Sequence, residues 1–303
     1  MTFTVVGLGE VLWDVLPTGS QLGGAPANFA YHAAALGARA MMLTRVGDDE
    51  LGGEVIRRFT RMNLPGHTVQ VDPARPTGTV AVTLDEKGAP QYTFAEDVAW
   101  DHLAATDVAL QAVRGAHAVC FGTLAQRSRI SRKAIQQLVA AAPDDALKIF
   151  DINLRLDYYS REVIEESMCL ANVLKLNDEE LAVLTTMFSL RGDVRQRIEE
   201  LVRTFGFKIV VVTYGPSGSL IHQEGRWLEV SPQPVQVVDT VGAGDAFTAA
   251  LTMGLLRRMD LGEVHAMAAE IARYVCSERG ATPPLPEAFR KRFQGGVDRR
   301  NAF

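Results

Sequence analysis

Cysteine is scarce in this 303-residue sequence, and long apolar runs are missing. The three cysteines, Cys120, Cys169 and Cys276, lie far apart among apolar residues and form no C-x-x-C pair. This spacing argues against a disulfide framework and favours free thiols in a reducing compartment. No run of about 18 apolar residues occurs, so we expect no membrane-spanning segment. Residues 1–7 also lack the basic region of a secretion signal, and we therefore expect a cytoplasmic protein.

Positive charge is not concentrated anywhere along the chain. Lysine and arginine number 31 against 36 acidic residues, which gives a formal net charge of −5. The arginine pairs at 57–58, 257–258 and 299–300 are scattered. This distribution argues against nucleic acid as the main partner. The hydrophobic content of 47% and the charged content of 22% are typical of a globular protein with a large core.

Two common nucleotide-binding motifs are missing or incomplete. No G-x-x-x-x-G-K-[S/T] segment is present, which excludes a P-loop kinase. Gly7-Leu8-Gly9 follows a strand-like segment and invites comparison with a dinucleotide-binding loop. Leu12 stands where the third glycine of that loop belongs, and no helix clearly follows. A NAD-dependent dehydrogenase is therefore only a weak alternative.

Apolar strand-like segments alternate with segments of helical periodicity along most of the chain. The strand-like segments are 3–8, 40–46, 116–121, 147–151, 173–177 and 209–213. The helical segments are 26–36, 51–62, 131–141, 161–169, 178–186, 194–205 and 246–256. This alternation predicts β-α-β units, and hence an α/β fold with a mostly parallel sheet covered by helices on both faces.

Two regions break this rhythm because no helix separates their strands. Residues 10–16 are expected to continue the first strand, and 77–84 and 91–95 alternate about a turn at 85–88, as in a hairpin. We expect these pieces to form a small β-sheet lid, built from about residues 10–22 and 72–100 of a single domain spanning 1–303. A further hairpin is expected over 218–230.

The strongest functional motif is the small-residue loop D-T-V-G-A-G-D at 239–245, which opens into an apolar helix. Gly242 and Gly244 let the backbone approach a ligand closely, and the N–H groups at a helix start attract anions. Asp245 falls in the first helical turn, where the helix dipole favours its ionised form. A carboxylate beside a phosphate-binding loop is a suitable proton acceptor for a hydroxyl nucleophile. Taken alone, the same pattern also fits an acid at a helix start after a glycine turn.

A second glycine loop, Gly23-Gly24, leads into a helix that carries Asn28. Paired glycines permit close backbone approach, and the amide offers both a donor and an acceptor. Asp14 lies nearby, and an aspartate and an asparagine together can hold adjacent hydroxyl groups of a polyol. A tight turn followed by a helix start is the structural alternative.

Together these two motifs resemble the paired motifs of the ribokinase-like (phosphofructokinase-B type) carbohydrate kinases. The first motif continues to G-D-D-E-L-G at 47–52, and intermediate markers follow in the expected order over nearly the whole chain. Within that family the sequence is most similar to bacterial fructokinases. The resemblance implies a ribokinase-like three-layer α/β/α sandwich with a β-sheet lid. It also implies ATP and Mg²⁺ as cofactors and fructose as the expected acceptor.

The resemblance assigns a role to individual positions. Asp245 matches the catalytic base, and the backbone of Gly242, Ala243 and Gly244 matches the anion hole. The residues implied in sugar binding are Asp14, Gly23, Gly24 and Asn28, with Arg127 and Arg155 as further candidates. The residues implied in nucleotide binding are Asn177, Thr213, Gly215, Gly218, Gly242 and Gly244.

Metal ligands are also implied by the resemblance. Glu180, in the segment Asn177-Asp178-Glu179-Glu180, matches an Asn-x-x-Glu motif that organises Mg²⁺ mostly through water. The same four residues also fit a helix cap followed by acids in the first turn. Asp239 is a candidate ligand for K⁺, although Val241 replaces the threonine found in ribokinases.

The lid of several family members pairs between subunits, and we expect a homodimer here too. The alternating residues Val80, Val82 and Leu84 would give the lid an apolar face that needs a cover.

The acceptor stays open among several kinases of the family. A 2-keto-3-deoxygluconate kinase would need a cation such as Arg127 or Arg155. A nucleoside kinase would need a stacking aromatic such as Trp13, Phe94 or Trp100, and a ribokinase is a further option. A non-catalytic sugar sensor on the same fold is the alternative from another functional class.

Overall fold

The structure of the chain is a computed structural model that describes residues 2–16, 19–84, 90–231 and 233–294. In the described residues, the main sheet has nine strands in the order β13-β12-β11-β10-β9-β8-β1-β4-β5. The strands are β1 (Thr4–Leu8), β4 (Arg39–Gly47), β5 (Val69–Asp72), β8 (Ala118–Phe121), β9 (Leu147–Asp151), β10 (Val173–Asn177), β11 (Ile209–Thr213), β12 (Ser219–Gln223) and β13 (Arg226–Val230). Neighbours from β11 to β5 pair in parallel, whereas β12 and β13 are antiparallel.

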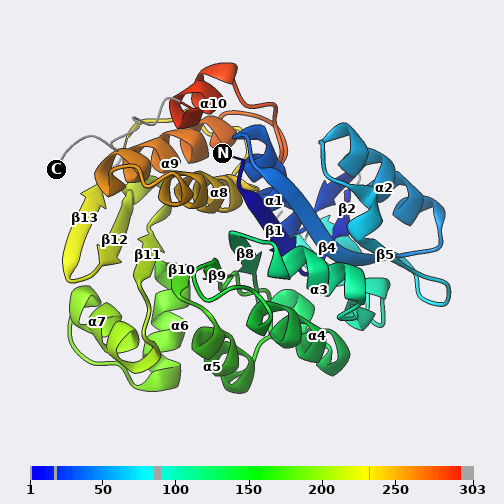
Figure 1. Cartoon of the computed structure of the whole chain (residues 1–303), viewed down its shortest axis with the longest axis horizontal. Helices are drawn as coiled ribbons and strands as arrows, with labels where there is room; N and C mark the ends of the chain where they lie inside the picture. The colour runs from blue at the N-terminus through cyan, green and yellow to red at the C-terminus, as the bar shows by residue number, and fades with distance from the viewer. Residues whose placement is uncertain (1, 17–18, 85–89, 232, 295–303) are drawn as a thin grey trace.

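Helices cover both faces of this sheet, which confirms the predicted three-layer sandwich (Figure 1). One face packs against α3 (Asp107–Arg114), α4 (Arg129–Ala140), α5 (Arg161–Leu170), α6 (Asp178–Phe188) and α7 (Val194–Phe205). The other packs against α1 (Ala25–Ala35), α2 (Glu50–Arg61), α8 (Ala243–Leu256), α9 (Leu261–Cys276) and α10 (Glu287–Gln294). Central strands such as β11 are apolar on both sides because neither face meets water.

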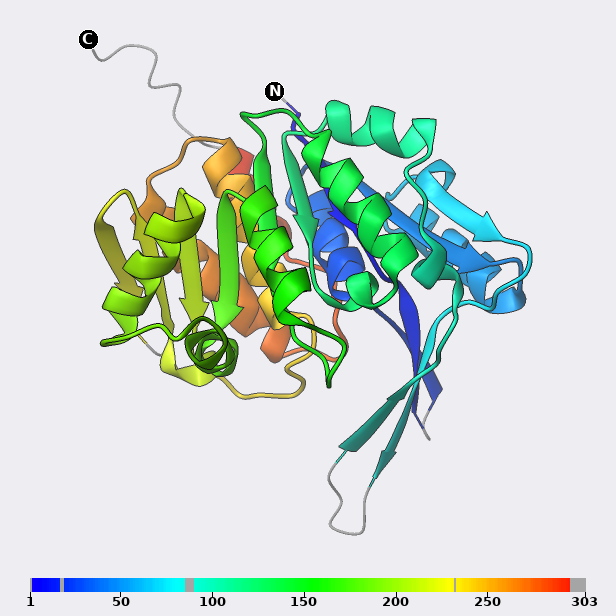
Figure 2. The same ribbon diagram turned by 90° about the horizontal axis from the view of Figure 1, so that it is seen from below.

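A second sheet projects from this body (Figure 2). In the described residues it has four strands in the order β3-β2-β6-β7, namely β2 (Leu12–Leu16), β3 (Gly19–Gly23), β6 (Thr79–Leu84) and β7 (Pro90–Phe94). The antiparallel pairing of β6 with β7 confirms the predicted hairpin, whose turn at 85–88 lies outside the described residues. The predicted hairpin over 218–230 is also present, as β12 and β13.

The expectation that residues 10–16 continue the first strand is wrong. β1 ends at Leu8, and β2 begins at Leu12 in the other sheet. Gly9 has a φ of 145°, a conformation that is easy only for glycine, and the chain turns away from the main sheet there. The four-stranded sheet is therefore attached to the main sheet through the segment that follows β1.

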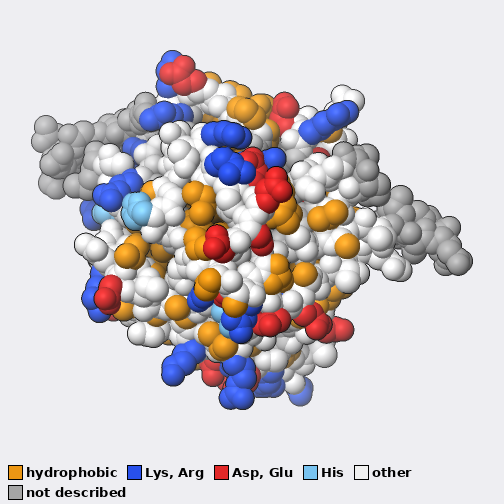
Figure 3. Space-filling view, turned by 90° about the vertical axis from the view of Figure 1, so that its right-hand side faces the viewer, with side chains coloured by type: hydrophobic (Ala, Val, Ile, Leu, Met, Phe, Trp, Pro, Cys, Tyr) orange, Lys and Arg blue, Asp and Glu red, His pale blue; other side chains and the backbone are white. Residues whose placement is uncertain are grey.

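No helix in the described part of the chain combines the length and the apolar character needed to cross a membrane. Figure 3 shows one face of the molecule, on which acidic and basic side chains are interspersed with apolar ones. Neither acidic nor basic side chains dominate that face.

Candidate active site

The candidate site lies where the parallel strands end and α8 begins. β9 ends at Asp151, β10 at Asn177 and β11 at Thr213, and these strands are neighbours in the sheet. Asn177 is in register with Thr213, and Lys175 is in register with Asp151. Ligands of open α/β sheets bind outside the carboxyl ends of the strands, so the fold itself directs attention to this edge.

Asp245 and Asn28 meet directly at this edge. The Asn28 side chain, on α1, donates a hydrogen bond of 2.8 Å to Oδ2 of Asp245, on α8. Asn28 is buried, whereas Asp245 retains partial exposure. Desolvation and the negative charge of Asp151 raise the pKa of Asp245 to about 6, against the opposing effects of Asn28, Lys175 and Arg155. Asp245 is therefore ionised at neutral pH and can accept a proton near that pH.

The loop before α8 is shaped for an anion. Gly242 is the N-cap of α8 with φ 80° and ψ −9°, and a Cβ atom there would collide with the backbone of Ala281. Among the described residues, no hydrogen bond uses the N–H groups of Gly244 or Asp245. Free N–H groups at the start of a 14-residue helix form an anion site. The arrangement therefore fits the phosphate groups of a nucleotide.

Buried charges lie behind this loop. Nζ of Lys175 is 3.0 Å from Oδ1 of Asp151, and both side chains are buried. The Thr248 hydroxyl, on α8, lies 3.0 Å from Oδ2 of Asp151. A Cβ atom at Gly244 would lie 3.1 Å from the Lys175 ammonium. The ion pair therefore touches the anion-binding loop from inside the protein.

The two N-terminal glycines allow close packing at the base of the four-stranded sheet. A Cβ atom at Gly23 would lie 2.6 Å from Oδ2 of Asp14, which is on β2. Gly24 has a φ of 114°, and a Cβ atom there would lie 2.6 Å from the Glu10 carbonyl oxygen. Burial raises the pKa of Asp14, and the charge of Arg155 opposes this effect. The glycine pair thus brings Asp14 next to the start of α1, and hence towards Asn28.

Arg155 and Glu10 add charge to the same region. The Arg155 side chain is exposed, and its recorded hydrogen bond goes to the carbonyl of Leu154. Its positive charge lowers the pKa values of Glu10, Asp14 and Asp245. Glu10 is buried, and burial raises its pKa to about 7. The region therefore holds several acids whose pKa values respond to the charge of one exposed guanidinium group.

The segment Asn177 to Glu180 forms a capping box at the start of α6. The Asn177 side chain accepts from the Glu180 N–H, and Oε2 of Glu180 accepts from the Asn177 N–H, both at 2.8 Å. Oε1 of Glu180 accepts from the Leu154 N–H at 2.9 Å. Among the described residues no cluster of three His, Cys, Asp or Glu side chains could hold a metal ion. A Mg²⁺ ion bound through water and nucleotide phosphates is compatible with such a site.

The remaining sequence candidates lie in two loops. Asp239 accepts hydrogen bonds from the N–H groups of Val241 and Gly280, so it joins the loop before α8 to the chain after α9. Gly215 and Gly218 form the turn between β11 and β12 with positive φ values, and the space around a Cβ at Gly215 is open. This turn starts at Thr213, beside Asn177.

The Arg127 side chain is surrounded by residues that hold parts of the fold together. Its guanidinium group pairs with Asp101 at 2.8 Å, donates to the Ala95 carbonyl, and lies over the rings of Trp100 and Tyr158. Apart from Trp100, which was a candidate only for a nucleoside acceptor, none of these contacts involves another residue predicted for the site. The interactions hold the end of β7 and the following turn against the main body.

Sequence reasoning missed Lys175, Thr248 and Glu10. Lys175 could have been noticed because it interrupts the otherwise apolar strand β10, in a sheet covered on both faces. Glu10 could have been noticed because it is an acid only two residues after the apolar strand β1. Nothing in the sequence distinguishes Thr248 from other threonines on helices.

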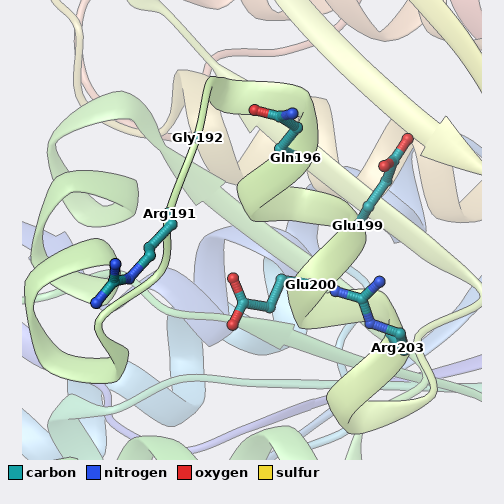
Figure 4. Close-up of a pocket in the computed structure, with 6 residues that line it drawn as sticks. All are labelled: Arg191, Gly192, Gln196, Glu199, Glu200 and Arg203. Carbon is teal, nitrogen blue, oxygen red and sulfur yellow. The ribbon is translucent and has the colours of Figure 1, made fainter.

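A hollow on α7 lies apart from these residues (Figure 4). It is formed by the helix and by the turn before it, and its lining residues are Arg191, Gly192, Gln196, Glu199, Glu200 and Arg203. It contains no residue of the candidate site and has the mixed charge of a solvated helix surface.

Comparisons with known proteins agree with this geometry. The fructokinase of Klebsiella pneumoniae is 31% identical over 297 residues, which cover 92% of this chain and 95% of that protein. A crystal structure of an uncharacterized sugar kinase from Pyrococcus horikoshii in complex with ATP has a TM-score of 0.79 at 27% identity, covering 92% of this chain and 94% of that one.

A crystal structure of a fructokinase from Vibrio cholerae O395, in a form with fructose, ADP and calcium bound, shows the same fold. Its TM-score is 0.80 at 24% identity, and it covers 96% of this chain and 99% of that one. The model of the pfkB family carbohydrate kinases matches residues 9–288, and thus both glycine loops, the four-stranded sheet and Asp245. This chain belongs to the pfkB family of carbohydrate kinases.

Proposed function

We propose that the chain transfers the γ-phosphoryl group of ATP to a terminal hydroxyl group of a small sugar, with fructose as the acceptor. The observation that carries the proposal is the position of Asp245. Its carboxylate is held by Asn28 at the start of α8, beside N–H groups that have no partner among the described residues. The fructokinase relative from Klebsiella pneumoniae supports fructose as the sugar.

Asp245 is the general base in this mechanism. Because Oδ2 accepts the hydrogen bond from Asn28, Oδ1 is left for the sugar hydroxyl. The carboxylate takes the hydroxyl proton as the sugar oxygen bonds to the γ-phosphorus. The bond from that phosphorus to the β–γ bridging oxygen breaks, and ADP leaves. A base with a pKa of about 6 is well matched to this transfer at neutral pH.

The loop Gly242-Ala243-Gly244 stabilises the charge on the transferring group. The N–H groups of Gly244 and Asp245, which have no partner among the described residues, and the positive end of α8 face the place where negative charge spreads over the phosphoryl oxygens. Mg²⁺, when bound, neutralises phosphate charge, and Glu180 would hold its water shell. Asn177, Thr213, Gly215 and Gly218 line the nucleotide side, and Asp239 is the candidate K⁺ ligand.

The sugar lies between the lid and the main sheet. Asp14, Gly23, Gly24 and Asn28 hold its hydroxyl groups, and the four-stranded sheet excludes water from the reacting atoms. Arg127 holds the end of the lid against the main body, because its Nε and Nη2 atoms donate to the Asp101 carboxylate and the Ala95 carbonyl. In this proposal residues 1–303 act as one cytoplasmic kinase unit that dimerises through the lid.

One observation favours a second acceptor. Among the described residues, the exposed guanidinium group of Arg155 donates one hydrogen bond, to the neighbouring Leu154 carbonyl, and its charge lowers the pKa values of Asp14 and Asp245. A free cation of this kind suits an acceptor with a carboxylate, such as 2-keto-3-deoxygluconate. With fructose as acceptor, Arg155 instead contacts hydroxyl groups or phosphate.

A coupled assay of ADP release tests the proposal. Mg-ATP is offered with fructose, ribose, 2-keto-3-deoxygluconate, fructose 6-phosphate or adenosine, with and without K⁺. We expect turnover with fructose. Turnover with 2-keto-3-deoxygluconate alone would transfer the assignment to the sugar acid. Sugar binding without turnover of any compound would favour the non-catalytic sensor.

Asp245→Asn tests the base in the same assay. We expect turnover to fall by roughly 10³-fold while ADP binding, measured by calorimetry, persists. Glu263→Gln is the matched control because Glu263 is an exposed acid in the first turn of the neighbouring helix α9. Near-normal turnover of Asp245→Asn would contradict the assignment of the base.

A further inference from the structure

Lys175 lies inside the sheet but faces the helix that carries the base. On β10, Leu174 and Leu176 pack into the core on the α3–α7 side of the sheet. Side chains alternate along a strand, so Lys175 points to the opposite side, with Val173, where α8 and α9 pack. A lysine in that position must bury its charge, which the structure confirms.

The Lys175 ammonium group is held directly behind the first turn of α8. Asp151 fixes it through the 3.0 Å ion pair, and Thr248 approaches the other oxygen of Asp151. The Thr248 hydroxyl also lies 2.9 Å from the Gly244 carbonyl oxygen. Since a Cβ at Gly244 would lie only 3.1 Å from Nζ, the cation touches the loop residue next to Asp245.

A buried ion pair is a poor device for stability alone. Desolvation of the two charges commonly cancels their attraction, and apolar residues of the same volume often stabilise a fold as well or better. Although burial opposes the charge, Asp151, Glu180 and Asp245 together raise the pKa of Lys175, so the ammonium stays protonated throughout the physiological range. The site therefore contains a permanent cation that no catalytic step described above uses.

We propose that Lys175 is a positioning residue for phosphoryl transfer, whose permanent charge behind Gly244 keeps the Asp245 carboxyl group ionised and ready to accept a proton. Asp151 holds the ammonium in place. The inference rests on the proposed role of Asp245 as the base. In this proposal Lys175 lowers the pKa of Asp245, whereas Asp151, its ion-pair partner, raises that pKa.

The charged groups around Asp245 come from several elements of the fold. They are Asp151 on β9, Lys175 on β10, Arg155 after β9, and Glu10 after β1. Asp151 raises the pKa of Asp245, whereas Lys175 and Arg155 lower it. Asn28 contributes a hydrogen bond that also favours the anion. Lysine and aspartate of one ion pair thus act on the base in opposite directions.

The test compares Asp151→Asn with the double variant Asp151→Asn/Lys175→Met. In this pair of proteins only the lysine differs, and no Asp151 carboxyl group can take up the proton instead of Asp245. The pKa of Asp245 is measured directly by carbon NMR of aspartates labelled at Cγ, with the signal assigned by loss in Asp245→Asn. We expect the pKa to be about one unit higher in the double variant than in Asp151→Asn.

The pH profile of kcat/KM gives a second readout. Its acid limb should shift to higher pH by the same amount between these two variants, because the base must be ionised. Lys148→Met, at the opposite end of β9, is the matched control and should leave the acid limb unchanged. If Asp151→Asn fails to fold, Lys175→Met alone is used. In that variant the combined titration of Asp151 and Asp245 should move to higher pH.

If the pKa of Asp245 is the same in Asp151→Asn and in the double variant, the proposal is overturned. This holds even where the double variant is less stable. The NMR titration does not depend on turnover. It therefore separates this inference from the proposed function. A shifted Asp245 pKa in a protein that phosphorylates none of the sugars would support the electrostatic role and contradict the function.

Discussion

The side-chain amide of Asn28 lies 2.8 Å from Oδ2 of Asp245, although 217 positions separate the two residues in the chain. One residue belongs to the first turn of α1 and the other to the first turn of α8, and these helices pack side by side on one face of the sheet. The contact joins the helix that follows Gly23-Gly24 to the helix that follows the glycine loop at 242–244. It fixes the direction of the carboxylate and favours its charged form.

Replacement of Asn28 by alanine should raise the pKa of Asp245, because burial and Asp151 would then act with less opposition. We expect the acid limb of kcat/KM to move to higher pH, and activity at pH 7 to fall roughly tenfold, the equivalent of one hydrogen bond to a charged group. Steady-state rates between pH 5 and 9 provide the measurement. Asn63→Gly, at an exposed turn after α2, is the control. An acid limb that stays in place would contradict this account.

Gly242→Ala should abolish most of the activity. The new Cβ would collide with the Ala281 carbonyl oxygen, and φ 80° is a strained value for alanine. Because the loop N–H groups would be displaced, we expect a loss in kcat of about 10² or more. Single-turnover rates and urea unfolding separate activity from stability.

Gly206→Ala is the matched control for that experiment. Gly206 ends α7 with φ 74°, and no atom lies within 4 Å of a Cβ built there. The substitution carries the same backbone strain, of about 1 kcal/mol, without the collision. We expect slightly lower stability and unchanged kcat. Equal losses of kcat in the two variants would show that strain, rather than the loop geometry, controls the rate.

Glu10→Gln should change how stability depends on pH. Burial raises the pKa of Glu10 to about 7 in the folded protein from an ordinary value of 4.5. Between these values the folded state holds a proton that the unfolded state has lost, so the free energy of unfolding decreases as pH rises. The full decrease is about 3 kcal/mol at 1.36 kcal/mol per unit.

Urea unfolding at pH 5 and pH 8 checks this prediction. Relative to the parent protein, Glu10→Gln should gain stability at pH 8, because glutamine carries no charge to bury, and should gain little at pH 5. A stability difference that is the same at both pH values would contradict a buried, titrating Glu10.

Much of the fold and the site could be predicted from the sequence, because the information is local. Parallel strands of β9 to β11 appear as short apolar runs, and the start of α8 is marked by its glycines. The sequence does not reveal the break after β1, because residues 3–16 contain no proline or charge cluster that would end a strand. Only the φ of Gly9 and the pairing of β2 with β6 reveal it.

The ion pair behind the loop could not be predicted, for a different reason. Lys175, Asp151 and Thr248 lie on three elements, and their proximity depends on strand order and on the packing of α8. The roles of Asn177 and Glu180 were open between a helix cap and a magnesium motif. The structure shows the cap, and the magnesium role stays a prediction.

The proposed dimer makes a prediction about the lid. Val82 and Tyr92 are paired neighbours on the face that also carries Asp14 and Val80, and Tyr92 is 48% exposed. If two lids pack through this face, Tyr92→Asp should convert dimers to monomers in sedimentation experiments, because a charge would be buried in the interface. Gln91→Asp, on the opposite face, is the control. A parent protein that sediments as a monomer would refute the dimer.

The route of the chain through the lid has a mechanical consequence. β2 carries the backbone from the main sheet into the lid, and β3 returns it straight into α1, with Gly23 and Gly24 at the junction. The lid and the helix that holds Asn28 are therefore joined by a short, direct stretch of backbone. In the proposed kinase, a tilt of the lid over a bound sugar would be passed along β3 to the hydrogen bond on Asp245. The proposed admission of the sugar and the alignment of the proposed base would thereby be linked through the backbone itself.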